Sequence, residues 1–306
     1  GFCVRLKKLQ NLAAALAPSY VRFGGTLADF VDFDPDGVQS PDSLDSEGRG
    51  VRDAEDAEDL PISIKLPGGS HVAGLRWDNI TRFCDIAGWD IMWDFNLLHF
   101  KKGRWDPTYA KKFLKYSASR GVRIPSFQLG NEPNLYKPKF NLDIDGNQLA
   151  EDFWTLKDVL SEMPQYAGSG LYGPDVTNLD QHKSARTYLA QYVSHAVFII
   201  IYYLKGEEAK LKDFIDPRVM DGLKTQLEYG YNITWDNCRV RKPLRLTETS
   251  TATGGGVEGI SNAYVAGFLW LDKLGVSAMF GVTHIFRQTF FASNYALISR
   301  ELEPNP

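Results

Sequence analysis

The chain has 306 residues, a formal net charge of −4, 43% hydrophobic residues and 13% aromatic residues. This length suits one large α/β domain or two smaller ones, with apolar residues enough for a sizeable core. The negative charge argues against a nucleic-acid partner, and no apolar run reaches the 18 residues of a membrane-spanning helix.

Strands and helices are predicted to alternate along most of the chain, because apolar residues recur at helical spacing in some segments and form short runs bounded by Gly or Pro in others. The expected helices are 6–17, 77–87, 107–120, 148–160, 184–196, 218–229 and 260–274. The expected strands are 20–23, 90–98, 125–130, 171–175, 197–204, 243–248 and 278–287.

This alternation predicts an α/β fold, a (β/α)8 TIM barrel that is incomplete at its N-terminal strand, since seven strands are expected where a barrel needs eight. A doubly wound sheet is the second interpretation, but no phosphate-binding glycine pattern follows a predicted strand. We expect residues 1–306 to form one catalytic domain. Within it, the polar segment 32–75 is expected to be an insertion or linker, because Asp, Glu, Pro, Ser and Gly dominate it.

Two of the predicted strands lead directly into a glutamate. Residues 124–130 run into Asn131 and Glu132, and 244–247 run into Glu248. With the missing strand counted first, these glutamates follow strands four and seven, whose C-terminal ends lie across the mouth of a barrel. Two carboxylates about 5–5.5 Å apart suit a retaining glycoside hydrolase, with one acid/base and one nucleophile. Each glutamate alone also fits an ordinary turn or an exposed strand end.

Other polar features leave their roles open. Arg22, inside a predicted strand, fits a site residue and a structural ion pair equally well. The run 254–256 is three glycines, which can present backbone N–H groups to an anion or form a flexible loop. The three cysteines lack metal-ligand spacing, so we expect no metal and no cofactor. Asn79 and Asn232 begin sequons that permit glycosylation of a secreted protein.

Longer stretches around these motifs resemble the heparanase family. They include 20–26, 129–134, 171–176, 248–256, 266–275 and 287–291. The resemblance covers nearly the whole chain outside 32–75. It implies a retaining endo-β-glucuronidase of the (β/α)8 clan that acts on heparan sulfate or a related glycosaminoglycan. It also implies a secreted, extracellular-matrix or lysosomal protein, with a first strand and a C-terminal β-sandwich domain that we expect to be missing from this chain.

Carried over residue by residue, the resemblance makes Glu132 the acid/base and Glu248 the nucleophile. It assigns Asn131 to the sugar 2-hydroxyl. The positions that it assigns to the glucuronate subsite are Thr26, Tyr202, Gly254, Gly255, Gln288 and Tyr295. Among these, the two glycine backbones and the Tyr295 hydroxyl would bind the sugar carboxylate.

Several positions depart from the family pattern. The family's Trp-His-His-Tyr-Tyr run is Ile-Ile-Ile-Tyr-Tyr at 199–203, which puts Ile200 where a histidine helps to set up the nucleophile, and Thr253 replaces a tyrosine. The positions of the sulfate-gripping basic residues, and the lysines beside them, are Pro138, Asp180, Gln181, Lys137, Lys139 and Lys183. These changes predict a lowered rate. They leave open a non-catalytic or weakly active glycan-binding relative, or an inactive fragment.

Overall fold

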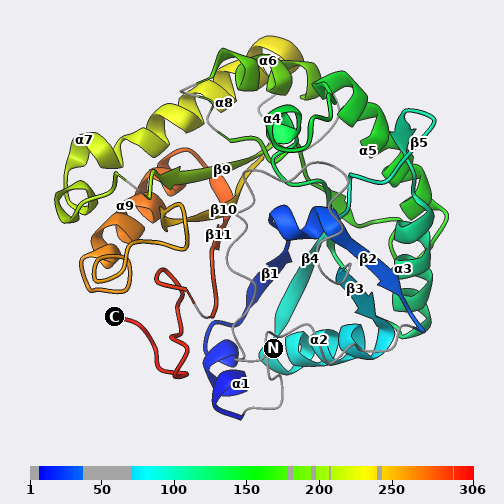
Figure 1. Cartoon of the computed structure of the whole chain (residues 1–306), viewed down its shortest axis with the longest axis horizontal. Coiled ribbons are helices and arrows are strands. Elements are labelled where there is room, and N and C mark those ends of the chain that lie inside the picture. The colour runs from blue at the N-terminus through cyan, green and yellow to red at the C-terminus, as the bar shows by residue number, and fades with distance from the viewer. Residues whose placement is uncertain are drawn as a thin grey trace. The chain divides into compact units, whose positions relative to one another are not determined.

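The computed structural model describes residues 7–36, 70–177, 179, 182–193, 198–206, 208–239, 243–291 and 293–306 (Figure 1). The chain divides into two compact units, Gly1–Tyr172 and Gly173–Pro306. Most of the predicted insertion, residues 37–69, lies outside the described residues, as do Asp180 and Gln181. None of the described helices is long and apolar enough to cross a membrane.

The first unit is built on a four-stranded parallel sheet in the order β1-β4-β7-β8. Its strands are β1 (Ser19–Phe23), β4 (Trp89–Phe95), β7 (Ser126–Leu129) and β8 (Gly170–Leu171). Its helices are α1 (Lys7–Ala14), α2 (Gly74–Ala87), α3 (Thr108–Ser119), α4 (Tyr136–Phe140) and α5 (Gly146–Ser161). Parallel neighbours need a crossover between them, which the helices supply.

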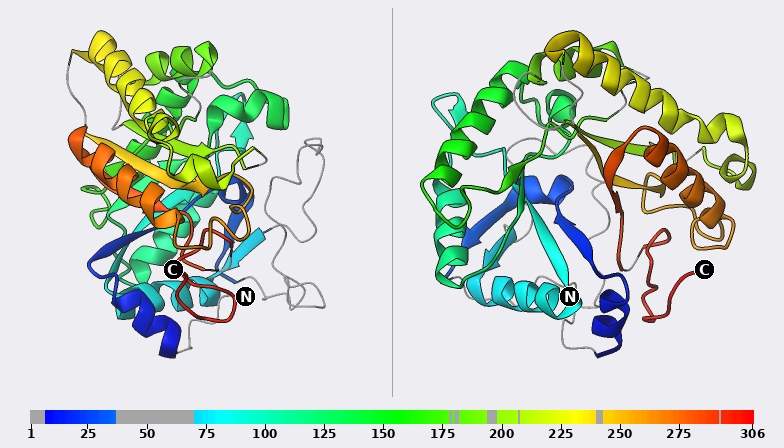
Figure 2. Two further views of the ribbon diagram at one scale, coloured as in Figure 1. Left: turned by 90° about the vertical axis from the view of Figure 1, so that its left-hand side faces the viewer. Right: turned by 180° about the vertical axis from the view of Figure 1, so that it is seen from behind.

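Aromatic side chains join α2 and α3 to one face of this sheet. Figure 2 shows these two helices, in cyan and blue-green, beside the strands. The Trp93 ring of β4 stacks on Phe113 of α3 at 4.5 Å and meets Trp77 of α2 edge-on at 4.9 Å. The Trp77 indole N–H donates to Ser117 Oγ at 3.0 Å. Because side chains alternate along a strand, Asp94, which follows Trp93, points to the opposite face.

The described ends of segment 32–75 contain strand structure that the sequence did not predict. β2 (Val31–Asp34) and β3 (Ser70–Ala73) pair in parallel, with Val31 opposite Ser70. The Phe33 ring packs on Phe113 at 5.4 Å, which anchors β2 over α3. A short hairpin, β5 (Phe100–Lys101) and β6 (Arg104–Trp105), lies between β4 and α3.

The second unit holds a three-stranded parallel sheet in the order β11-β10-β9. Its strands are β9 (Phe198–Leu204), β10 (Leu244–Ala252) and β11 (Val282–Arg287). Its helices are α6 (Lys183–Tyr192), α7 (Pro217–Met220), α8 (Gly222–Cys238) and α9 (Ala266–Met279). A bridge between Val176 and Ile200 extends the pairing beyond β9.

Strand β10 is bulged at two places along β9. Leu246 lies opposite Ile200 and Glu248 opposite Ile201, so that one extra residue stands between them. A second shift falls between Thr249, opposite Tyr202, and Ala252. Bulges bend a strand and redirect its side chains, and they are common beside active sites.

The observed elements confirm the predicted alternation of strands and helices, with corrections at their ends. Helix α9 runs to Met279, whereas residues 278–281 were predicted to begin the last strand. Gly281, at φ 70°, ends the helix, and its N–H donates to Ala278 O at 3.0 Å. Strand β10 continues past Glu248 to Ala252, so this glutamate lies within its strand and does not end it.

Candidate active site

Glu132 stands on a sharp turn directly after β7. Its own backbone is left-handed, with φ 50° and ψ 49°, and Gly130 before it has φ 81°. A Cβ on Gly130 would lie 2.6 Å from Leu97 Cδ2, so this approach requires glycine. Pro133 then begins a 3-10 helix, η4 (Pro133–Leu135). The turn leaves the Glu132 side chain 17% exposed at the carboxyl end of the strand.

Arg22 holds the residue before Glu132 through buried polar contacts. Its Nη2 donates to Asn131 Oδ1 at 2.9 Å, and its Nε donates to Gln128 Oε1 at 2.6 Å. The same guanidinium lies 3.5 Å from the carboxylate of Asp94, whose side chain is fully buried. Of the two roles considered for Arg22, the structural ion pair is therefore present. The same guanidinium also fixes the Asn131 amide. Because Oδ1 accepts from Arg22, the Asn131 NH2 group is turned away from that guanidinium.

Asp29 contacts the same turn from the 3-10 helix η1 (Thr26–Phe30), whose first residue is the predicted subsite residue Thr26. Its Oδ2 accepts from the Asn131 backbone N–H at 3.3 Å. Burial raises the pKa of Asp29 to about 7, against hydrogen bonds from Tyr136 and backbone N–H groups and the positive charge of Lys139. A buried carboxyl with a pKa near 7 therefore contacts the residue before the predicted acid.

The lysines near Glu132 are engaged with carboxylates. Lys139 Nζ lies 2.8 Å from Glu132 Oε2, and Lys137 Nζ lies 2.5 Å from Asp143 Oδ2. Two of the three lysines considered for sulfate binding therefore already have acidic partners. The third, Lys183, is exposed at the start of α6.

In the second unit, Glu248 is the only residue of the nine in β10 whose side chain is not buried. The Tyr203 hydroxyl lies 3.0 Å from Glu248 Oε1 and also bonds to Gln288 Oε1. The Gln288 backbone N–H donates to Thr249 O at 2.9 Å, which ties the end of β11 to β10. The carboxylate of Glu248 is thus oriented by a side chain from β9.

The predicted subsite residue Tyr202 lies on the other face of β9, which is a correction to the sequence interpretation. Its ring is 4.9 Å from Lys273 Nζ, and a Cβ on Gly222 would come within 2.4 Å of its hydroxyl. Adjacent strand residues point to opposite faces, so only Tyr203 can face Glu248. By the same alternation, the isoleucine on the Glu248 face is Ile201, and Ile200 faces the helices.

The glycine run lies beside Tyr295. Gly254, Gly255 and Gly256 have φ values of 75°, 79° and 85°, a region that suits glycine. The Tyr295 backbone N–H donates to Gly255 O at 3.2 Å, and its ring lies 6.2 Å from the Tyr203 ring, near parallel. The second unit therefore gathers Glu248, Gln288, Tyr295 and the glycines.

Thr253, which precedes the glycines, has a structural contact of its own. Its Oγ1 accepts from the Gly206 N–H at 2.9 Å, and its N–H donates to Leu204 O at 2.9 Å. The residue that replaces the family tyrosine thus fastens the glycine loop to the end of β9.

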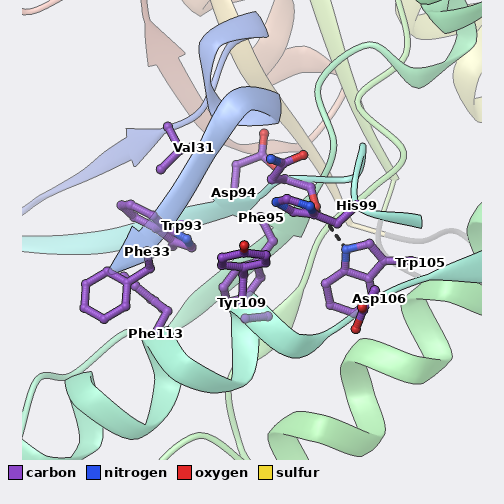
Figure 3. A pocket seen from close by; sticks show the side chains of 12 residues that line it. Val31, Phe33, Trp93, Asp94, Phe95, His99, Trp105, Asp106, Tyr109 and Phe113 are labelled. Atoms are coloured by element: carbon purple, nitrogen blue, oxygen red, sulfur yellow. Dashed lines mark hydrogen bonds between the residues drawn. The ribbon is translucent and has the colours of Figure 1, made fainter. Parts of the chain in front are cut away.

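A separate pocket lies among β2, β4 and α3 (Figure 3). Mostly aromatic side chains line it, and the His99 ring stacks on Tyr109 at 4.5 Å while its Nε2 contacts Asp32. None of the predicted site residues lines this pocket. It belongs to the aromatic packing between the sheet and α3. Among the described residues, no group of three His, Cys, Asp or Glu side chains converges as a metal site would.

Residues 3–275 match the family described as glycosyl hydrolase family 79, N-terminal domain. The chain belongs to this family. The match confirms the resemblance seen in the motifs around Glu132 and Glu248.

Named relatives extend this family 79 assignment. The chain is 32% identical to heparanase of Gallus gallus, over 99% of this chain and 63% of that protein. It is 28% identical to inactive heparanase-2 of Homo sapiens, over 98% of this chain and 58% of that protein. It is also 28% identical to hyaluronoglucuronidase of Hirudo nipponia, over 98% of this chain and 62% of that protein. The chain spans about 60% of the length of these curated relatives.

Solved glycosidase structures share the fold of this family 79 chain. The match to the GH51 arabinofuranosidase of Xanthomonas axonopodis pv. citri covers 97% of this chain and 62% of that enzyme's chain, with a TM-score of 0.64 and 13% sequence identity. The match to AbfB of Bifidobacterium longum, a family 51 α-L-arabinofuranosidase, covers 97% of this chain and 63% of the AbfB chain, with a TM-score of 0.61 and 12% sequence identity. The likeness confirms the expected fold class, that of (β/α)8 glycosidases.

Sequence reasoning on this family 79 chain missed several residues that support the two glutamates. Tyr203 is adjacent to the predicted Tyr202, and only the register of β9 against β10 distinguishes them. Asp94 and Gln128 carried a signal, since each is a polar residue between two apolar residues of its strand. Asp29 carried none, because its contact depends on how η1 folds back onto the β7 turn.

Proposed function

We propose that this chain carries the catalytic machinery of a retaining β-glucuronidase that cleaves heparan sulfate or a related glucuronide-containing glycan. The observation that supports it most is the environment of Glu248. It is the one accessible side chain of a buried strand, and the Tyr203 hydroxyl, which also contacts Gln288, orients its carboxylate. A nucleophile needs such orientation to reach an anomeric carbon in line.

In the proposed reaction, Glu132 and Glu248 divide the chemistry of a double displacement. Glu248 attacks the anomeric carbon while Glu132 gives its proton to the departing glycosidic oxygen, which forms a glycosyl ester on Glu248. Glu132 then takes a proton from water as that water attacks the anomeric carbon, which breaks the bond from that carbon to the Glu248 oxygen, releases the Glu248 carboxylate and retains the anomeric configuration. The mechanism requires the two carboxyls about 5–5.5 Å apart. Asn131, held by Arg22, is proposed to bind the sugar 2-hydroxyl.

The glucuronate carboxylate is proposed to bind at the glycine run. The backbone N–H groups of Gly254 and Gly255, with the Tyr295 hydroxyl, would supply neutral donors to an anion. Thr26 and Gln288 are proposed to complete the subsite, with Tyr203 in the place that the sequence assigned to Tyr202.

Substrates of low sulfation are proposed to suit the site better than highly sulfated ones, because Lys137 and Lys139 are paired with carboxylates. Hyaluronan, suggested by the name of the leech relative, is a second glucuronide to test. We also propose a secreted or lysosomal location, where such glycans occur, for a protein glycosylated at Asn79 and Asn232.

A second candidate function is glycan binding without cleavage. Two observations favour it: the Lys139 ammonium engages the proposed acid at 2.8 Å, and the Glu248 face of β9 carries the apolar Ile201. The relative named inactive heparanase-2 is 28% identical to this chain. In this alternative the same surface holds the glucuronide, but Glu132 is not available to donate a proton.

The two functions separate in an assay on heparan sulfate, hyaluronan and an aryl β-glucuronide. We expect the parent protein to shorten at least one polymer, and Glu248→Gln and Glu132→Gln to abolish that cleavage. Glu208→Gln, a change at an exposed carboxylate paired with Lys205, is the matched control and retains activity. No turnover of any substrate, with binding retained, would establish the second function. Cleavage that survives Glu248→Gln would rule out this nucleophile.

A further inference from the structure

Lys273 is a buried lysine behind the strand that carries Glu248. It lies on α9, its side chain is 1% exposed, and it faces the sheet. A buried ammonium is costly unless hydrogen bonds and charges compensate it. The contacts of its Nζ therefore indicate what the residue stabilises.

The Lys273 ammonium binds the two residues that follow Glu248. Nζ donates to Thr249 Oγ1 at 2.9 Å and to the Ser250 carbonyl oxygen. The Thr249 hydroxyl in turn donates to the Tyr202 carbonyl of β9. Nζ also lies 4.9 Å from the centre of the Tyr202 ring. One lysine thus links α9 to both β10 and β9.

These contacts fall on the second bulge of β10. The register with β9 shifts between Thr249 and Ala252, and Ser250 lies inside this interval. A bulge disrupts the regular ladder, so its backbone groups need partners from elsewhere. Nζ supplies a donor at this point, one residue after Thr249 and two after Glu248.

We propose that Lys273 is a positioning residue that fixes the direction of Glu248 by holding the second bulge of β10. The inference rests on the proposed function of Glu248 as nucleophile. Lys273 itself touches neither Glu248 nor the sugar. It acts through the Thr249 hydroxyl and the Ser250 carbonyl oxygen, and the positions of these two residues determine where the Glu248 carboxylate lies.

The matched variants are Lys273→Met, which keeps the length of the side chain without its donors, and Thr249→Val, which removes the hydroxyl at nearly constant volume. Lys224→Met, at an exposed lysine of α8, controls for the loss of one charge. The assay is covalent trapping of Glu248 by a 2-deoxy-2-fluoro-glucuronyl fluoride, followed by mass spectrometry of the intact chain and of the labelled peptide. The maximal trapping rate and the half-saturating concentration are measured separately.

Lys273→Met is expected to lower the maximal trapping rate by about 100-fold, the cost of a misplaced reacting group, and to leave half-saturation unchanged. Thr249→Val is expected to lower the rate less, and the double variant no more than Lys273→Met alone. A purely structural role would change the unfolding midpoint and not the trapping rate. Equal trapping rates in folded Lys273→Met and the parent would overturn the proposal.

If Lys273→Met does not fold, Thr249→Val decides, and its trapping at the parent rate would overturn the proposal. Failure of the proposed function is distinct, since the parent protein itself would then show no label on Glu248.

Discussion

The Arg22 guanidinium donates from Nη2 to Asn131 Oδ1 at 2.9 Å, so strand β1 holds the residue that precedes the proposed acid. The guanidinium keeps its charge at any working pH, and it is buried with Asp94 and Gln128 around it. The contact joins stability and activity in a single side chain, since the same cation supports a buried carboxylate and an amide at the site.

Arg22→Met is expected to reduce the free energy of unfolding by about 3–5 kcal/mol, because it leaves the buried Asp94 carboxylate without its cation. Urea denaturation measures the loss. Arg218→Met, at an exposed ion pair with Asp216, is the control and is expected to leave the midpoint nearly unchanged. An Arg22→Met midpoint equal to that of the control would show that the buried pair contributes nothing.

Tyr203→Phe is expected to lower kcat about tenfold. A tenfold change corresponds to about 1.4 kcal/mol, which is close to the contribution of one hydrogen bond to a charged group. The reason is the loss of the hydroxyl that contacts Glu248 and Gln288. Steady-state kinetics on an aryl glucuronide provides the measurement. Tyr202→Phe, on the opposite face of β9, is expected to retain kcat. The reverse order would return the subsite assignment to Tyr202.

Gly130→Ala is expected to destabilise the protein more than Gly121→Ala. Both glycines have positive φ, which costs another residue about 1–2 kcal/mol. Only at Gly130 would the new Cβ collide, with Leu97 and with the Tyr136 hydroxyl, whereas it meets nothing within 4 Å at Gly121. The difference between the denaturant midpoints of the two variants measures the cost of the collision alone. We expect the collision to lower the free energy of unfolding by about a further 1–3 kcal/mol. Equal midpoints would contradict the close packing at Gly130.

Stability is expected to fall as pH rises from about 4 to about 7 because of Asp29. Its folded pKa is about 7, raised by burial above the ordinary value of 3.8, so the folded state binds more protons in this window. The free energy of unfolding therefore decreases with pH there. Asp29→Asn, which mimics the neutral carboxyl, is expected to flatten this slope in urea titrations at several pH values.

Asp143→Asn, at an exposed carboxylate, controls for the loss of one negative charge. Parallel slopes for Asp29→Asn and the parent protein would show that Asp29 keeps an ordinary pKa in the folded chain.

The sequence by itself determined the alternation of strands and helices and the positions of Glu132 and Glu248, because both follow from local patterns. Apolar runs, glycines and prolines act on neighbouring residues, and Gly130 and Pro133 mark the turn at Glu132 without reference to the rest of the chain. The errors of local reasoning were correspondingly local, such as the late end of α9 at Gly281.

Only the tertiary structure decided which side chains support those glutamates, because strand register and long-range pairing are not encoded in any one segment. A shift of one residue exchanges the faces of a strand, and this separates Tyr203 from Tyr202 and Ile201 from Ile200. The bulges of β10 exist only relative to its neighbouring strands, and the contacts of Lys273, Arg22 and Asp29 each join elements distant in the chain. Glu132 and Glu248 were visible in the sequence, and the groups that orient them required the fold.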